Sequence, residues 1–275
     1  MKRKVVLGFS GGLDTSYCVK YLCEEKGYEV HSIIVNTGGF NEEELREIEL
    51  HAYRLGVTTH HRVDAVKSYY DRILRFLIYG NVLKNNTYPL SVSAERLIQA
   101  LHIAEHTRRL KADAVAHGST GAGNDQVRFD MIFHIMIPGV EIITPIRDLR
   151  LSREEEIAYL KGLGVDMNFE KSLYSINKGL WGTSVGGKET LSSNGMLPEE
   201  AWPTQVTKTG NEEVKLGFEK GELVTVNDQS FIHPADAIPS LQTLAGPYGI
   251  GRDIHVCDTI IGIKGRVGFE AAAPM

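Results

Sequence analysis

Cysteine is scarce in this sequence, with only Cys18, Cys23 and Cys257, and no two of the three form a CxxC pair. An odd number of cysteines without such a spacing indicates neither a disulfide framework nor a zinc site. The pair His60-His61 does not supply one either, because adjacent histidines on a strand point to opposite faces. We therefore predict that the protein itself has no metal site.

Long apolar runs are also missing, and none approaches the ~20 residues that a membrane-spanning helix needs. The basic N-terminus Met1–Lys4 is followed by only five strand-like residues, Val5–Phe9. The apolar region of a signal peptide is longer and ends at a small-residue cleavage site. We therefore expect a cytoplasmic protein.

An excess of basic charge is lacking as well. The chain has 30 Lys and Arg against 35 Asp and Glu, a net charge of −5, whereas nucleic-acid-binding domains usually carry a basic face. We expect small molecules rather than nucleic acid as partners, and an anionic substrate would need a local positive site. With 275 residues, 42% of them hydrophobic, the chain can bury a sizeable core and divide into two domains.

The stretch SGGLDTS, Ser10–Ser16, follows directly on the apolar run Val5–Phe9 and precedes a helical pattern. A strand, glycine turn and helix in this order present backbone N–H groups to a phosphate. A Walker-type loop would require a lysine, yet none lies between Lys4 and Lys20. Hydroxyl groups, glycine amides and the carboxylate of Asp14 are available instead. We interpret the stretch as a pyrophosphate-binding loop rather than an ordinary glycine turn.

Strands and helices alternate behind this loop, which predicts βαβ units and a parallel sheet. Apolar runs predict strands at 30–35, 57–63, 112–116 and 141–144. Helices are predicted up to Gly27 and at 41–56, 65–80, 94–110 and 152–164, where Asn41 with Glu44 and Ser152 with Glu155 resemble capping boxes.

The alternation ends beyond residue 164. Short strands near 215–218, 223–226 and 260–264 and a helix near 235–245 follow. We place the domain boundary near residue 167, which gives domains at 1–167 and 168–275. The polar, glycine-rich stretch 174–188 is predicted to be a long loop, either functional or a solvated connection between domains.

A second glycine-rich loop, STGAGNDQVRF at Ser119–Phe129, follows the predicted strand 112–116. The carboxyl edge of a parallel sheet is where ligands bind. Arg128 lies three residues after Asp125 and is expected to face the same site, where its guanidinium would suit a carboxylate. Alternatively, Asn124 or Asp125 merely caps the next helix.

Together these motifs resemble the argininosuccinate synthase family, within the N-type ATP pyrophosphatase, or PP-loop, superfamily. SGGLDTS is typical of the superfamily and HGSTGAGNDQVRF of the enzyme family, and TPIRD, GIGRDI and GIKGR extend the similarity over essentially the whole chain. The resemblance implies an α/β fold. A parallel-sheet nucleotide-binding domain of the adenine nucleotide alpha hydrolase-like, PP-loop type would be followed by an α+β synthetase domain.

The resemblance also implies a two-step ligation in arginine biosynthesis, with ATP and Mg²⁺. The ureido oxygen of citrulline attacks the α-phosphate of ATP and releases pyrophosphate, and the α-amine of aspartate then displaces AMP to give argininosuccinate. No residue of the sequence is identified as a magnesium ligand. The family forms homotetramers through a C-terminal segment that lies beyond Met275, so we expect a chain truncated at its C-terminus, in which tetramer assembly and full activity are in question.

Site residues follow from the resemblance motif by motif, with Asp14 and Arg128 as the catalytic pair. Catalysis would consist of positioning and charge stabilisation, without a protein nucleophile. The implied ATP-binding residues are Gly8, Phe9, Ser10, Gly11, Gly12, Leu13, Asp14, Thr15, Ser16, Val35 and Gly118. The implied aspartate-binding residues are Thr120, Asn124 and Asp125. The implied citrulline-binding residues are Tyr88, Ser93, Asn124, Arg128, Ser175, Ser184, Cys257 and Phe269.

Two of these positions depart from the family pattern. Cys257 and Phe269 stand where the family has a glutamate and a tyrosine that contact citrulline. Without the carboxylate, a buried ammonium would cost several kcal/mol, which leads to the hypothesis that this protein binds a citrulline whose α-amine is acylated, for instance by a succinyl group. The alternative is that Asp258, or a shift in register, supplies the carboxylate.

Three other functions compete with this one. Another PP-loop ligase or amidotransferase would share SGGLDTS but not GNDQVRF. A tRNA-modifying PP-loop enzyme would call for a basic face and commonly a cysteine or zinc module. A non-catalytic nucleotide-binding protein is the third alternative, because of the expected truncation.

Overall fold

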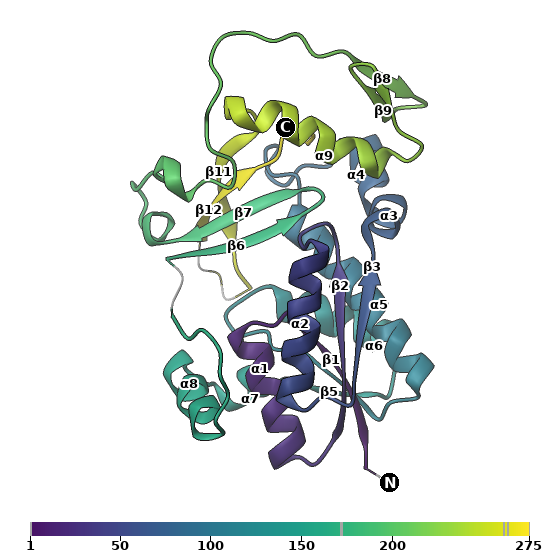
Figure 1. Ribbon diagram of the computed structural model, residues 1–275, viewed down its shortest axis with the longest axis vertical. Coiled ribbons are helices and arrows are strands. Elements are labelled where there is room, and N and C mark those ends of the chain that lie inside the picture. The colour runs from purple at the N-terminus through teal and green to yellow at the C-terminus, as the bar shows by residue number, and fades with distance from the viewer. Residues whose placement is uncertain (1, 171–172, 261, 263, 275) are drawn as a thin grey trace. The chain divides into compact units, whose positions relative to one another are not determined.

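The computed structural model describes residues 2–170, 173–260, 262 and 264–274, which form two compact units (Figure 1). The last transition between the units is close to the predicted boundary near residue 167, but 37–39 and 65–95 also belong to the second unit. Unit 1 consists of Met1–Asn36, Phe40–Asp64 and Arg96–Lys171, and unit 2 consists of Thr37–Gly39, Ala65–Glu95 and Ser172–Met275.

Unit 1 is built on a five-stranded sheet in the order β3-β2-β1-β4-β5. Every neighbouring pair in it is parallel, which confirms the predicted parallel sheet. The strand order reverses between β1 and β4, and in open parallel sheets ligands bind beside the carboxyl ends of the strands at such a point. The strands are β1 (Lys4–Gly8), β2 (Glu29–Asn36), β3 (Thr59–Asp64), β4 (Ala114–Ala116) and β5 (Glu141–Ile143).

The core on one face of this sheet packs β1 and β4 against α1 (Leu13–Lys20), α2 (Glu42–Leu55) and α8 (Arg153–Gly162). The predicted capping boxes are both present, at Asn41 with Glu44 and at Ser152 with Glu155. These caps satisfy backbone N–H groups that would otherwise lack partners and so fix where α2 and α8 begin. The remaining helices are α5 (Ser91–Leu110), which begins in unit 2, α6 (Asp125–Met136) and α7 (Pro145–Leu149), and a π-helical turn at Tyr21–Glu25 extends α1.

Unit 2 contains two antiparallel sheets, with the strand orders β11-β12-β7-β6 and β10-β9-β8. The predicted short strands near 215–218 and 223–226 and the helix near 235–245 are confirmed. The strands are β6 (Tyr174–Gly179), β7 (Gly182–Gly187), β8 (Leu216–Glu219), β9 (Glu222–Val226), β10 (Gln229–Ser230), β11 (Arg252–Asp258) and β12 (Lys264–Glu270), and the helices are α3 (Val66–Tyr69), α4 (Arg75–Tyr79) and α9 (Pro234–Ala245).

The stretch 174–188 is not the long loop that its composition predicts, because it forms the hairpin β6–β7. Glycine, serine and threonine hide the strand pattern, and pairing with β12 stabilises it. At the hairpin turn the indole N–H of Trp181 donates to the carbonyl of Pro89 at 3.1 Å. The strand predicted at 260–264 falls partly on 261 and 263, outside the described residues, and the chain forms β11 before it and β12 from residue 264 onward.

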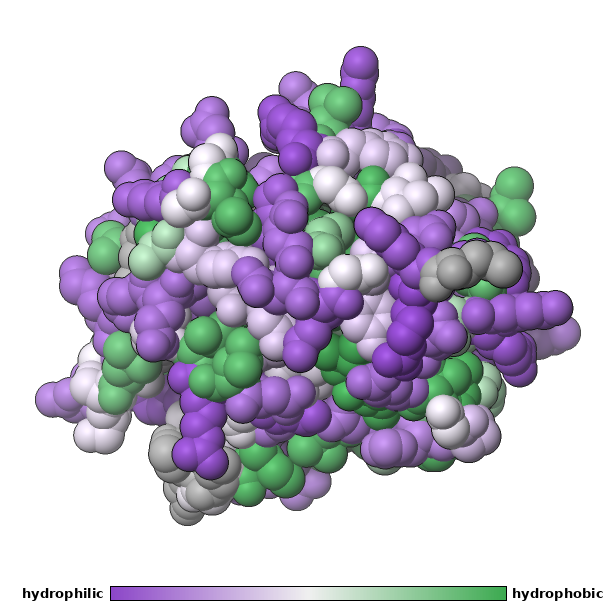
Figure 2. All heavy atoms as spheres, turned by 90° about the horizontal axis from the view of Figure 1, so that it is seen from below, coloured by the Kyte–Doolittle hydropathy of each residue, from purple (hydrophilic) through white to green (hydrophobic). Residues whose placement is uncertain are grey.

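The surface mixes hydrophilic and hydrophobic side chains on the face seen from below in Figure 2. Large exposed apolar residues occur in several elements, including Ile135 on α6 and Phe218 on β8. Among the described helices, none combines the length and apolar character needed to cross a membrane.

Candidate active site

The loop between β1 and α1 has the geometry of an anion-binding turn. Gly12 is the N-cap of α1, with extended backbone and no side-chain cap, so the first N–H groups of the helix are not taken by a capping side chain. Ser10 and Gly12 are exposed, and Asp14 and Thr15 are half-buried. Backbone N–H groups at a helix N-terminus favour phosphate, and the binding of ATP by these residues stays a prediction.

Hydroxyl groups hold the loop closed from within. The hydroxyl of Thr15 donates to the carbonyl of Gly12 at 3.2 Å and accepts from the N–H of Ser10 at 3.4 Å. The hydroxyl of Ser16 is fully buried and donates to the same Gly12 carbonyl at 2.8 Å. Its direct contact with ATP stays a prediction, and in the structure it fixes the direction of the Gly12 carbonyl.

His51 on α2 is a residue that sequence reasoning missed. Its Nε2 lies 2.9 Å from the hydroxyl oxygen of Ser16. Either the imidazole or the hydroxyl group is the donor in this contact, depending on the tautomer of the His51 ring. Burial and the charge of Arg54 lower the pKa of His51 below its usual value, which favours the neutral ring. His51 thus supports the loop from outside the motif.

The loop after β4 packs directly on the first one. A Cβ placed on Gly118 would lie 3.3 Å from the carbonyl carbon and the Cβ of Asp14 and 3.3 Å from the methyl carbon of Thr15. Only a residue without a side chain allows this approach without displacing its neighbours. The structure therefore brings the two glycine-rich loops together at the point where the strand order reverses. Val35, also predicted to bind the nucleotide, is buried near the carboxyl end of β2.

Asp125 and Arg128 point at one another from the first turn of α6. The carboxylate of Asp125 accepts from Nη1 of Arg128 at 2.7 Å and from Nε of Arg96 at 2.9 Å. Burial alone would raise the pKa of Asp125, but Arg96 and Arg128 outweigh it and lower the pKa below its usual value. Asn124 is the N-cap residue of α6, yet its side chain makes no capping hydrogen bond, so capping does not explain it. Thr120 is exposed on the same loop.

The second loop is fixed by a network that the sequence did not reveal. The amide nitrogen of Gln126 donates to the carbonyls of Gly121 and Gly123, and its oxygen accepts from Nη1 of Arg147 at 3.0 Å. The same Nη1 contacts Asp130 at 2.6 Å, and Asp130 lies 3.0 Å from Nε2 of His117. All of these side chains lie in the stretches HGSTGAGNDQVRFD and TPIRD quoted above. Their place in these motifs is the signal in the sequence that could have identified them as parts of the site.

The predicted citrulline residues in unit 2 gather on one face of the sheet β11-β12-β7-β6. Strand pairing places Ser184 of β7 opposite Phe269 of β12 on one side and opposite Asn177 of β6 on the other. Ser175 is two residues from Asn177 on β6 and so lies on the same face. Cys257 lies on the same face. Asp253 of β11 pairs with Phe269 of β12, and Cys257 is four residues, an even number, along the strand from Asp253. The structure therefore brings together four residues that lie far apart in the sequence.

Tyr88 covers this face. Its ring lies 5.4 Å from that of Phe269 in a T-shaped contact and 5.0 Å from that of His255. Tyr88, Phe269 and Ala271 form a buried cluster against which Cys257 packs. Ser93, the remaining predicted residue of unit 2, is half-buried on α5.

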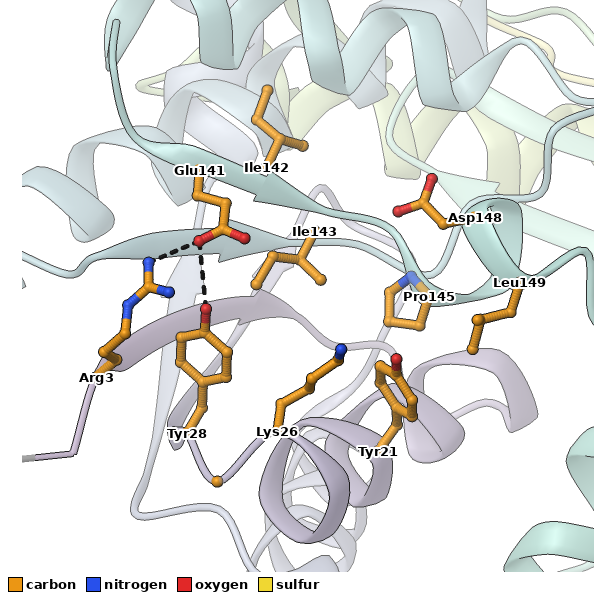
Figure 3. A pocket seen from close by; sticks show the side chains of 11 residues that line it. Arg3, Tyr21, Lys26, Tyr28, Glu141, Ile142, Ile143, Pro145, Asp148 and Leu149 are labelled. Carbon is orange, nitrogen blue, oxygen red and sulfur yellow. Dashed lines mark hydrogen bonds and ion pairs between the residues drawn. The ribbon is translucent and has the colours of Figure 1, made fainter.

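A pocket of about 510 Å³ extends along β5, from Arg3 and Tyr28 near the amino ends of β1 and β2 to Pro145, Asp148 and Leu149 beyond the carboxyl end of β5. Figure 3 shows Arg3 and Tyr28 both directed at the carboxylate of Glu141, at 2.6 and 3.3 Å. None of the predicted site residues lines it.

Comparison with known proteins gives matches along almost the whole chain. Residues 4–166 match the family model "Arginosuccinate synthase N-terminal HUP domain" and residues 174–275 match "Arginosuccinate synthase C-terminal domain". Among curated proteins, the argininosuccinate synthase of Methanocaldococcus jannaschii is 40% identical over 98% of this chain and 68% of its own length. Those of Sulfurisphaera tokodaii and Methanococcus maripaludis are 35% and 37% identical, over 99% and 100% of this chain and 69% and 70% of their own lengths.

Proposed function

The chain belongs to the argininosuccinate synthase family, and from this premise we propose that it joins a citrulline to aspartate at the expense of ATP. Members of the family are ATP-using ligases that form a carbon–nitrogen bond. The observation that carries the proposal is the contact between the lysine-free phosphate loop and the loop that bears GNDQVRF, seen in the approach of Gly118 to Asp14. The cytoplasm is the location we propose for this reaction.

The proposed reaction has two steps. The ureido oxygen of citrulline attacks the α-phosphate of ATP, the bond to the β-phosphate oxygen breaks, and pyrophosphate leaves. The α-amine of aspartate then attacks the ureido carbon, loses a proton and displaces AMP. The N–H groups at the start of α1 are suited to hold the pyrophosphate while its charge develops.

Other side chains of unit 1 are suited to the amino acids. We propose that Thr120, Asn124 and Asp125 hold aspartate and that Asn124 and Arg128 contact the carboxylate of citrulline. Within unit 2, the sheet face that carries Ser175, Ser184 and Phe269 is proposed to contact citrulline.

Magnesium would enter with ATP rather than reside in the protein. The described residues contain no group of three or more His, Cys, Asp or Glu side chains that could hold a metal ion. Mg²⁺ in phosphoryl-transfer sites keeps several waters and takes its other ligands largely from substrate phosphates. The ion would supply charge neutralisation on the triphosphate, while the residues of the two loops position it.

Sustained release of pyrophosphate tests the proposal. We expect the purified chain, given ATP and Mg²⁺, to release pyrophosphate over many turnovers only when a citrulline and aspartate are both present, with AMP formed in equal amount. Citrulline alone should give at most one equivalent per chain. Sustained pyrophosphate release that does not depend on both amino acids, or no pyrophosphate release at all, would show that the chain does not perform this reaction.

We further propose that the α-amine of the citrulline substrate is acylated. Cys257 packs against the apolar cluster of Tyr88 and Phe269, and it brings no carboxylate to the position where the family has a glutamate. Asp258 does not replace the missing carboxylate in this register, because neighbouring residues of a strand face opposite sides of the sheet. This geometry favours an uncharged amide nitrogen beside Cys257.

Steady-state kinetics with free and N-succinyl citrulline test the acyl group. We expect kcat/KM to be at least about ten-fold higher for the acylated substrate, because an unpaired ammonium in a buried site costs several kcal/mol. Replacing Cys257 with Glu should shift the preference toward free citrulline, whereas the matched change Asp258→Asn on the opposite face should leave the ratio unchanged. A preference of the wild type for free citrulline would refute the acyl hypothesis.

A further inference from the structure

Beside the phosphate loop lies an acidic side chain that the reaction outlined above does not use. Glu156, on α8, is only 3% exposed, and α8 packs against α1. The carboxyl groups of Glu156 and Asp14 are close enough to share a hydrogen bond. Asp14 lies in the first turn of α1, and its backbone and Cβ also meet Gly118 of the second loop. The partner of Glu156 is thus a residue of the candidate active site itself.

Two carboxyl groups can be hydrogen-bonded to each other only if a proton lies between them, because ionised carboxylates are acceptors without a donor. The Oε2 atom of Glu156 is buried and accepts no hydrogen bond from a donor among the described residues. A buried carboxylate oxygen without a donor is strongly destabilised, whereas the oxygen of a neutral acid is less so. A hydrogen bond between the two carboxyl groups requires a proton, and the buried Oε2 without a donor assigns that proton to Glu156, with Asp14 as the acceptor.

The charged and titratable groups around the pair favour the same assignment. Burial, followed by the charge of Asp14, raises the pKa of Glu156 to about 8, and burial also raises that of Asp14. Arg153, on α8, is the one cation acting on both carboxyl groups in the described structure, and it lowers both pKa values without reversing the shifts. From α1, Cys18 is buried and its thiol pKa is raised well above its usual value, so it adds no charge. Tyr17 is also on α1, and burial raises its pKa to about 12.

We propose that Glu156 is a positioning residue, which holds a proton at neutral pH and donates it to Asp14 so that the phosphate loop is oriented and carries one negative charge instead of two. A second negative charge beside the first would repel the triphosphate and would turn the Asp14 side chain away from Glu156. The inference rests on the proposed use of ATP by this loop. Whether Glu156 is protonated can nevertheless be tested without measuring any enzyme activity.

Thermal unfolding of the protein without substrates tests the proton directly. A glutamate whose pKa is raised by folding makes the protein lose stability as pH rises from the unfolded value near 4.5 to about 8. Glu156→Gln cannot titrate and keeps an N–H donor toward Asp14. We therefore expect the Tm of Glu156→Gln, relative to wild type, to increase between pH 5 and pH 8.5. The matched control Glu154→Gln changes an exposed residue of the same helix and should give a difference that does not depend on pH.

The KM for ATP tests the positioning role. If only the protonated pair binds ATP well, the wild-type KM should rise about ten-fold between pH 7 and pH 9, following the fraction of Glu156 that stays protonated. Glu156→Gln should stay within about two-fold of wild type at pH 7 and lack this rise. Glu156→Met, which keeps the bulk but not the donor, should raise KM at every pH.

The two measurements separate the possible failures. A Tm difference for Glu156→Gln that does not vary with pH overturns the shared proton, whatever the activity. A pH-dependent Tm with an unchanged KM profile in both variants overturns the positioning role and leaves a structural acid. Should the chain release no pyrophosphate, the proposed function fails, and the dissociation constant of ATP measured over the same pH range takes the place of KM.

Discussion

Replacing Asp125 with alanine is expected to lower kcat/KM for aspartate by a factor of about 100 to 1,000 and to destabilise unit 1. The Asp125 carboxylate accepts from Arg96 and Arg128, whose side chains are only 17% and 23% exposed. Removing one partner of a fully buried ion pair costs about 3–5 kcal/mol, and the cost here is expected to be smaller because the Asp125 side chain is 33% exposed. Here two guanidinium groups lose the same partner, and Arg128 is the residue proposed to contact a substrate carboxylate.

Urea unfolding and steady-state kinetics on matched variants separate stability from activity. Asp166→Ala, which removes an exposed carboxyl group of the same unit, should change neither measurement. The double variant Asp125→Ala with Arg96→Leu should be less destabilised than the sum of the two single changes, because the two residues share one network. If Asp125→Ala keeps its activity within about three-fold, Asp125 neither holds Arg128 nor contacts aspartate.

Unit 1 shows why this part of the fold could be predicted from the sequence. Its elements depend on local patterns, such as the apolar strand before SGGLDTS and the capping boxes at Asn41 and Ser152, and each has one structural solution. The meeting of the two glycine-rich loops also follows, because parallel strands bring their carboxyl ends to one edge of the sheet. The approach of Gly118 to Asp14 is the consequence of that rule.

The residues that the sequence did not reveal act through partners distant in the chain. His51 matters because Ser16 lies 2.9 Å away, and Glu156 because its carboxyl group lies within hydrogen-bonding reach of that of Asp14. Nothing in the spacing of these residues predicts such pairs. The strands β6 and β7 were missed for a related reason. Ser, Thr and Gly carry little strand signal, and the pairing of β7 with β12 spans more than eighty residues.

In unit 2, replacing Gly182 with alanine is expected to lower the free energy of unfolding by about 3–5 kcal/mol. The φ angle of Gly182 is +124°, where a non-glycine residue costs about 1–3 kcal/mol. Its Cβ would also lie 2.4 Å from Cζ of Phe269 and 2.7 Å from the Cβ of Ala271. Such overpacking costs about 1–3 kcal/mol more, and the Phe269 ring has little room to move because Tyr88 and His255 pack against it.

Gly186 on the same strand provides the control, because a Cβ there would meet no atom within 4 Å. We expect Gly186→Ala to stay within about 0.5 kcal/mol of wild type in urea unfolding. Adding Phe269→Leu to Gly182→Ala should restore part of the loss, since the smaller side chain relieves the clash. Equal stability of the Gly182 and Gly186 variants would contradict this packing. Because Phe269 shares its sheet face with Ser184 and Cys257, any Gly182→Ala protein that folds should show a raised KM for the citrulline substrate and an unchanged KM for ATP, which would link this face to one substrate only.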